Sequence, residues 1–107
     1  MGENILDAID DAIHAKVRLG IMSMLSVHGE CDFGFLRNEL QLTEGNLGNH
    51  IRVLEEAGYI AVSKSFVGKR PRTTCQSTSL GVEMFQQYIE GLEKIIRMAQ
   101  SATQRNK

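Results

Sequence analysis

Apolar residues recur every three or four positions through the first quarter of the chain, the spacing of an amphipathic helix. A first stripe runs from Ile5 to Ile13, and Asn4 in front of it is a suitable N-cap. A second stripe runs from Val17 to Leu25 and stops before Gly29. The pattern predicts two helices with a break near His14–Ala15.

Two further helices are expected at residues 33–41 and 43–57. Asp32 and Thr43 precede them as N-caps, because their side-chain oxygens can accept hydrogen bonds from free backbone N–H groups of the first turn. Gly58 follows the longer helix, where helices often end in a left-handed turn. That helix has one narrow apolar stripe, made of Leu47, Ile51 and Leu54.

The hydrophobic period changes after residue 58. Residues 59–63 and 73–78 are β-prone runs, and Gly68 and Pro71 between them are typical of a hairpin tip. A helical pattern returns from about Ser79 to about Thr103. The sequence therefore predicts a single domain over residues 1–107, mainly α with one small β-hairpin.

The helix at 43–57 has an outward face whose N-terminal half carries no bulky apolar residue. On a helical wheel the outward residues are Gly45, Asn49, Arg52 and Glu56, flanked by Asn46 and Gly48. An exposed helical glycine costs about 1 kcal/mol relative to alanine, and close approach to a groove wall or a phosphate would give a reason for it. Asn and Arg are the residues that make bidentate contacts with adenine and guanine edges. We expect this face to contact DNA; the alternative is an ordinary solvated face.

Positive charge is concentrated in one segment, although the formal net charge of the chain is −1. No acidic residue occurs between residues 57 and 82, which contain Lys64, Lys69, Arg70 and Arg72. A basic hairpin over residues 64–73 can lie along the phosphate backbone or place an arginine in a minor groove. The alternative is a charged loop that keeps the protein soluble.

Both ends of the chain carry apolar faces that a domain of this size cannot cover. The last helix, residues 80–103, has apolar spacings of three and four, as in a coiled-coil seam. We expect it and the first helix, residues 1–13, to pair two copies of the chain; the alternative is that they pack on each other. The expected interface residues are Ile5, Leu6, Ile9, Ile13, Phe85, Tyr88, Ile89, Leu92, Ile95, Ile96 and Ala99.

The run from Asn46 to Ile60 resembles the recognition-helix signature of the MarR and ArsR superfamily of winged-helix regulators. There a small residue, a His and an aliphatic residue lead to a Leu, an Ala-Gly pair and the first wing strand. The stretch from Gly68 to Thr74 is similar to the wing of small MarR-like regulators. The paired-cysteine motif of ArsR-type metal sensors is missing, and Ser77 replaces an aliphatic strand residue.

The resemblance implies a winged helix-turn-helix fold that binds double-stranded DNA as a homodimer, with one recognition helix per subunit in the major groove. It implies transcriptional regulation rather than catalysis. Together with the face and the charges described above, it gives the expected DNA-binding residues, which are Thr43, Gly45, Asn46, Gly48, Asn49, His50, Arg52, Lys64, Lys69, Arg70 and Arg72.

Other classes of function are not favoured. Cys31 and Cys75 lack metal-site spacing and are expected to be reduced thiols in a cytoplasmic protein. The three histidines are scattered, without a catalytic spacing, so we expect no enzyme and no metal or cofactor. We expect no secretory signal, because a basic stretch followed by an apolar one is missing after Met1, and no membrane span, because no apolar run is long enough.

Two alternatives to a DNA-binding regulator of this kind stay open. A winged helix can serve as a protein-interaction module of the transcription machinery, for which Phe66 and Val67 in the hairpin are the only hint. A regulator can also respond to a small molecule, and Met22 and Met24 could line a pocket for it, although core packing explains them equally well. The sequence names no effector.

Overall fold

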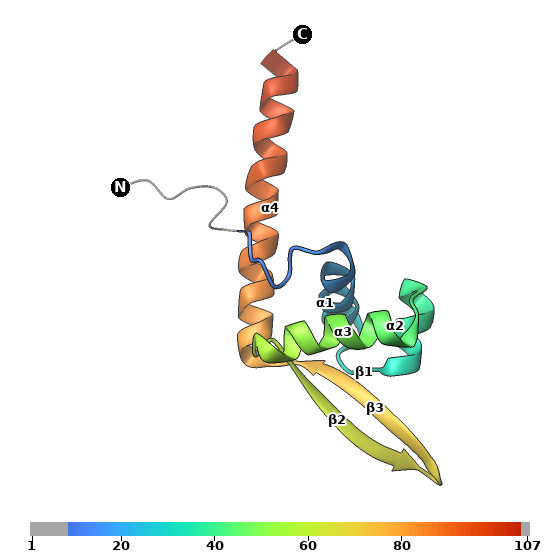
Figure 1. Cartoon of the computed structure of the whole chain (residues 1–107). Helices are drawn as coiled ribbons and strands as arrows, with labels where there is room; N and C mark the ends of the chain where they lie inside the picture. The colour runs from blue at the N-terminus through green and yellow to red at the C-terminus, as the bar shows by residue number, and fades with distance from the viewer. Residues whose placement is uncertain (1–8, 106–107) are drawn as a thin grey trace.

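The computed structural model describes residues 9–105 and confirms the mainly α fold with a hairpin. Three helices form the body, and the hairpin and the last helix leave it in different directions (Figure 1). The elements are α1 (Lys16–His28), β1 (Cys31–Asp32), α2 (Phe33–Leu40), α3 (Glu44–Glu56), β2 (Ile60–Val67), β3 (Arg70–Ser77) and α4 (Ser79–Arg105). None of the described helices is both long and apolar enough to cross a membrane.

The predicted helix boundaries of the body are confirmed at their caps. The Asp32 carboxylate accepts from the Phe35 backbone N–H at 2.7 Å, and the Thr43 hydroxyl accepts from that of Asn46 at 3.2 Å. Gly29 and Gly58, which follow α1 and α3, have φ values of +80° and +82°, which favour glycine, and α3 ends just before Gly58 as predicted. The sequence therefore determines where α2 and α3 begin.

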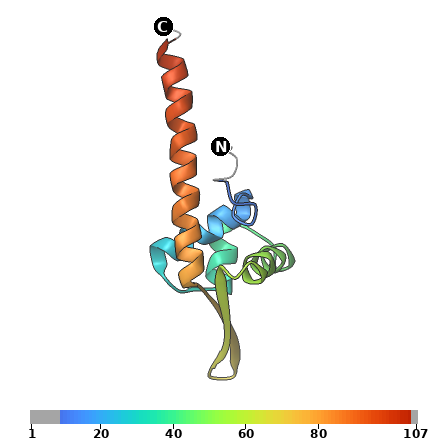
Figure 2. The same ribbon diagram turned by 90° about the vertical axis from the view of Figure 1, so that its left-hand side faces the viewer.

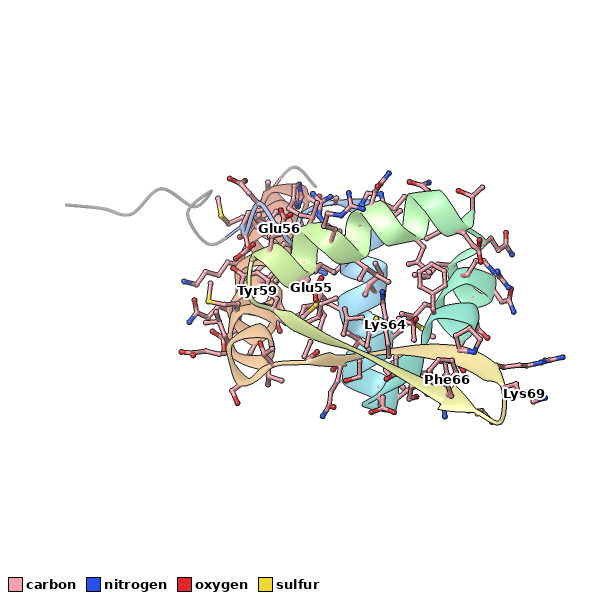
Figure 3. The ribbon with its side chains drawn as sticks, turned by 60° about the horizontal axis from the view of Figure 1, so that its bottom comes forward. Glu55, Glu56, Tyr59, Lys64, Phe66 and Lys69 are labelled. Atoms are coloured by element: carbon pink, nitrogen blue, oxygen red, sulfur yellow. The ribbon has the colours of Figure 1, made fainter. Side chains whose placement is uncertain are left out.

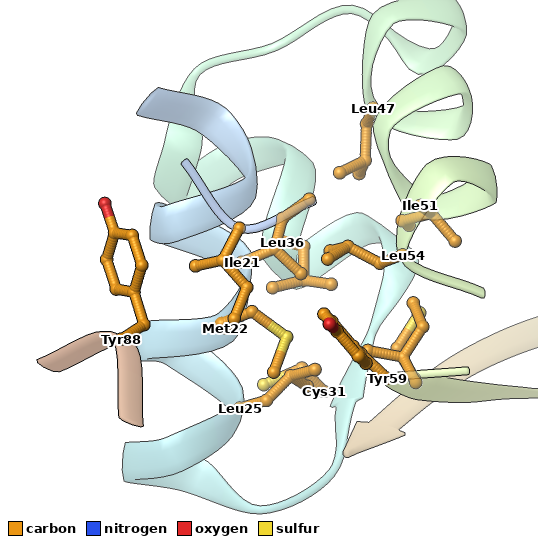
Figure 4. Close-up of a cluster of buried hydrophobic side chains, with 13 residues drawn as sticks. Ile21, Met22, Leu25, Cys31, Leu36, Leu47, Ile51, Leu54, Tyr59 and Tyr88 are labelled. Carbon is orange, nitrogen blue, oxygen red and sulfur yellow. The ribbon is translucent and has the colours of Figure 1, made fainter. Parts of the chain in front are cut away.

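The core lies where α1, α2 and α3 meet the base of the sheet (Figure 4). The predicted stripe of α3 faces inward, and its three residues are buried. Tyr88 reaches this core from α4, and Ile60 and Cys75 reach it from the sheet. The other members are Ile13, Ile21, Met22, Leu25, Cys31, Leu36 and Tyr59.

The sheet has three antiparallel strands in the order β1-β3-β2. The short strand β1, in which Cys31 pairs with Cys75, was not predicted from the sequence. Val67 pairs with Arg70, so the hairpin turn is the two residues Gly68 and Lys69. Gly68 has a φ of +65° and Lys69 does not have a positive φ, as in a type II′ turn. Pro71 thus lies within β3, and both strands are longer than their β-prone runs.

The predicted first helix, residues 1–13, is not found in its described part, since residues 9–15 form a turn and irregular chain. The Asp10 carboxylate accepts from the backbone N–H of Ala12 at 2.8 Å and of Ile13 at 3.2 Å. A side chain that bonds to its own backbone competes with helix formation, and here it caps a single turn. Asn4, Ile5 and Leu6 lie outside the described residues.

The junction between the hairpin and α4 depends on Gly81. The Thr78 hydroxyl accepts from the Gly81 backbone N–H at 3.0 Å and donates to the Gly58 carbonyl at 2.6 Å. A Cβ atom on Gly81 would overlap the carbonyl oxygen of Tyr59, which is backbone and cannot move aside easily. The close approach fixes how α4 leaves the domain.

Gly81→Ala is therefore expected to lower the free energy of unfolding by at least about 2 kcal/mol, because the added methyl group has no space. Gly45→Ala is the matched control: its Cβ meets nothing within 4 Å, and removal of a helical glycine is expected to stabilise by up to about 1 kcal/mol. Urea unfolding of both variants measures the difference. Equal stability of the two would contradict the packing at Tyr59.

Candidate nucleic-acid interface

The outward face of α3 is exposed and open. Gly45, Asn46, Asn49 and Arg52 are exposed, Gly48 is half-buried, and Thr43 serves as the N-cap. In the described structure nothing lies within 4 Å of a Cβ built on Gly45 or Gly48. Packing within the chain therefore gives no reason for the two glycines, and their cost to helix stability is uncompensated inside the domain.

Arg18 of α1 forms a hydrogen bond with His50 of α3. Its Nε donates to the Ala12 carbonyl at 2.6 Å, and its guanidinium donates to Nδ1 of His50 at 3.1 Å. A guanidinium can only donate, so Nδ1 of His50 is unprotonated. Burial and the charge of Arg18 lower the pKa of His50. His50, expected to touch DNA, therefore uses one ring nitrogen within the chain, and only Nε2 remains for a phosphate.

The segment at residues 9–15 connects Tyr59, at the start of the hairpin, to α4. The Tyr59 hydroxyl donates to the Asp10 carboxylate at 2.5 Å, and the Tyr88 hydroxyl lies 3.0 Å from Nδ1 of His14. Burial, followed by the bond to Asp10, raises the pKa of Tyr59 to about 12. Sequence reasoning missed Arg18, Asp10 and Tyr59, because their partners are as many as 49 residues away.

The hairpin projects past the helices as a separate arm (Figure 2). Every residue from Ser63 to Arg72 is exposed. Lys64, Lys69 and Arg70 have no ion-pair partner among the described residues. Arg72 differs, since its Nε lies 3.9 Å from a carboxylate oxygen of Asp32, the cap of α2. The arm thus offers three unpaired cations and a fourth that is partly neutralised.

The charges are divided along the interface. Besides Arg52, α3 carries Glu44, Glu55 and Glu56, so its side chains are net acidic. In Figure 3, Glu55 and Glu56 lie near Tyr59 at the base of β2, whereas Lys64 and Lys69 lie further out, toward the turn. The hairpin therefore supplies most of the attraction for a polyanion, and the outward face of α3 supplies hydrogen-bonding groups.

The expected dimer residues fall into two groups. Ile13 and Tyr88 are 0% and 2% exposed in the chain's own core and leave no surface for a second copy, which corrects that expectation. Ile9, Phe85, Ile89 and Leu92 pack against the same core and are partly buried. Further along α4 the apolar residues lack such cover, and these are Ile95 (half-buried), Ile96 and Met98 (54% and 60% exposed) and Ala99 (exposed).

An exposed polar helix beside a basic hairpin is the arrangement of a winged helix-turn-helix DNA-binding domain. A family model described as a winged helix DNA-binding domain matches residues 17–96, and the chain belongs to this family. The chain is also 37% identical, over 76 residues, to an uncharacterised protein of Methanocaldococcus jannaschii; the match covers 71% of this chain and 83% of that protein.

Solved structures of transcriptional regulators share the fold. A transcriptional regulator homologue from Pyrococcus horikoshii superposes with a TM-score of 0.77 at 35% identity, covering 82% of this chain and 87% of that one. A regulator of the MarR family from Enterococcus faecalis superposes with a TM-score of 0.66 at 21% identity, covering 95% and 84%. The protein therefore has a MarR-like winged-helix fold and, by family, a winged helix DNA-binding domain.

The bond between Arg18 and His50 predicts a pH dependence of stability. The pKa of His50 is lower in the folded chain than its ordinary value of 6.5, so the unfolded chain binds more protons below that pH. The stabilisation is complete above about pH 6.5 and is lost as the pH falls through the folded pKa. We expect the free energy of unfolding to fall between pH 7 and pH 5, and to fall less in His50→Gln.

Chemical unfolding at several pH values measures this dependence. His28→Gln is the control, because His28 packs edge-on against Phe35 and is exposed. An identical pH profile for His50→Gln and the unchanged protein would rule out a role for the pair.

Proposed function

We propose that the protein is a sequence-specific transcriptional regulator, a single domain that binds double-stranded DNA in the cytoplasm as a homodimer and is not an enzyme. In this proposal α3 enters the major groove and the hairpin lies on the backbone or in the adjacent minor groove. The observation that carries it is the open face of α3. Its two glycines, two asparagines and one arginine are not covered by any other part of the described chain.

The chemistry of that face supports sequence-specific contact. Asn49 and Arg52 are exposed on the same side of α3, and these residue types pair with adenine and guanine edges through two hydrogen bonds. The glycines let the helix backbone approach the groove closely. Glu55 and Glu56 at the end of α3 would repel a phosphate backbone, so the proposed contact uses the helix from its N-terminus as far as Arg52.

The distal part of α4 supports pairing of two copies. The helix has 27 residues, a length of about 40 Å, and rises well past the body of the domain (Figure 1). Ile96 and Met98 are exposed there on a stretch of helix with no other described element beside it. A second α4 would cover them, and a two-fold pair matches a two-fold DNA site.

The recognition helix is tested first by selecting bound duplexes from a random pool. We expect an inverted repeat whose half-sites lie about one helical turn apart. Asn49→Ala and Arg52→Ala should each reduce the preference for the selected site over a scrambled one by about 1–3 kcal/mol. Glu39→Ala, at an exposed position of α2, is the control and should leave the preference unchanged.

The selection has two unfavourable outcomes. A pool without an enriched sequence would contradict sequence-specific binding. An enriched site whose preference survives both substitutions would show that α3 does not read it.

The pairing of copies is tested by Ile96→Glu combined with Ala99→Glu, since two buried carboxylates would oppose each other at the interface. We expect sedimentation equilibrium to give a dimer for the unchanged protein and a monomer for this variant. Val27→Glu, at an exposed residue of α1, is the control and should remain a dimer. A dimeric double variant would place the interface elsewhere.

Response to a small molecule is a second candidate function, favoured by one observation. A hollow of about 310 Å³ lies between α1, the end of β3 and the start of α4. Met22, Leu25 and Phe85 line it, and Gln76 and Gln86 offer polar groups at its edge. Met24, expected as a lining residue, is not among its residues. One protein with the same fold, NadR, has been solved in complex with 4-hydroxyphenylacetate.

A further inference from the structure

Phe66 is the one aromatic residue among the large exposed hydrophobic side chains of residues 9–105. It is 74% exposed and lies near the end of the hairpin (Figure 3). An apolar ring of this size in water offers a favourable free energy to any partner that covers it. Because the strand continues four residues past half-buried Val62, Phe66 lies about 13 Å beyond Val62 along the hairpin.

The register gives Phe66 an apolar neighbour. Phe66 pairs with Pro71 across the hairpin, so the two side chains lie on the same face. In a two-residue hairpin the pair that closes the turn, Val67 and Arg70, exchanges ladder hydrogen bonds, and the next pair, Phe66 and Pro71, does not. The side chains of a non-bonded pair lie closer together than those of a bonded pair. A proline is tolerated at such a position because its missing N–H is not required by β2. We call the rings of Phe66 and Pro71 together the apolar edge of the hairpin.

This edge faces the same way as the recognition helix. Side chains alternate along a strand, so Ile60, Val62, Lys64 and Phe66 share one face of β2. Ile60 and Val62 pack into the core under α3, and the face that continues outward from them carries Lys64 and then Phe66. Val67 lies on the opposite face. A partner held by α3 would therefore meet Phe66 and not Val67.

The positive charges around the apolar edge indicate what kind of partner would bind there. Lys64 lies two residues before Phe66 on the same face, and Lys69 and Arg70 follow it at the turn, with no acidic residue between positions 57 and 82. A surface with an apolar ring between cations fits a polyanion that also exposes apolar surface. The minor groove of DNA has this character, with phosphates along both edges and sugar and base surfaces between them.

We propose that Phe66, supported by Pro71, is an apolar wedge that enters the minor groove of a DNA duplex beside the site contacted by α3. The inference rests on the proposed DNA binding and adds a contact of a different kind. Partial separation of a base step by such a wedge bends the duplex toward the major groove. The cations hold the hairpin on the phosphates, and Phe66 adds affinity that does not depend on salt.

The wedge is tested with Phe66→Ala, with Val67→Ala as the matched control on the opposite face and Lys69→Ala as the charge control. Dissociation constants for the selected duplex are measured over a range of salt concentrations. Phe66→Ala is expected to weaken binding roughly tenfold or more with an unchanged salt slope. Val67→Ala should stay within about two-fold of the unchanged protein. Lys69→Ala should reduce the slope by about 0.9.

A second readout is the distance between dyes at the two ends of the duplex, measured by energy transfer. The unchanged protein should shorten this distance, and Phe66→Ala should not. Binding by Phe66→Ala equal to that of the unchanged protein would overturn the wedge and favour a protein partner for Phe66. A weaker complex with a reduced salt slope would also overturn it, because Phe66 would then act by positioning the cations.

Failure of the wedge and failure of the proposed function are separate results. If the unchanged protein binds no duplex, both proposals are wrong. If it binds and loses affinity with Asn49→Ala or Lys69→Ala but not with Phe66→Ala, only the wedge is wrong.

Discussion

The burial of one narrow apolar stripe on α3 is the constraint on which the interface depends. Leu47 and Leu54 are fully buried, and Ile51 nearly so, against α1, α2 and the base of the sheet. Since only one side of the helix is anchored, the other side can be entirely polar or small without a loss of core. Burial of the stripe therefore stabilises the domain and leaves the opposite face of α3 without a role in packing.

A network of polar side chains fixes how α3, the hairpin and α4 are oriented relative to one another. Arg18 connects the turn at Ala12 to His50 on α3, Asp10 in that turn binds Tyr59 at the start of the hairpin, and His14 meets Tyr88 on α4. Buried or half-buried hydrogen bonds of this kind contribute little net free energy each but require specific geometry. The segment at residues 9–15, where a helix had been expected, thus links α3, the hairpin and α4 through hydrogen bonds, and we call it the clamp.

The division of roles within the interface follows from its charges. The acidic end of α3 and the basic hairpin lie at different places along it, so in the proposed complex long-range attraction and base contact come from different elements. This division also explains how a chain with a net charge of −1 can present a surface suited to DNA.

The sequence by itself determined the features that are local. Periodicity and capping residues predicted α1 to α4, the end of α1 before Gly29 and the turn at Gly58, because helix boundaries depend on neighbours three or four residues away. It also identified the exposed face of α3 and the basic hairpin. Tertiary structure alone decided the two-residue strand β1, the clamp around Asp10 and Arg18, and the close approach of Gly81 to Tyr59. It likewise divided the seam of α4 into a part that covers the core, with Tyr88, and a distal part that is uncovered. These features join residues that are distant in sequence, and a local pattern carries no information about which distant groups will meet.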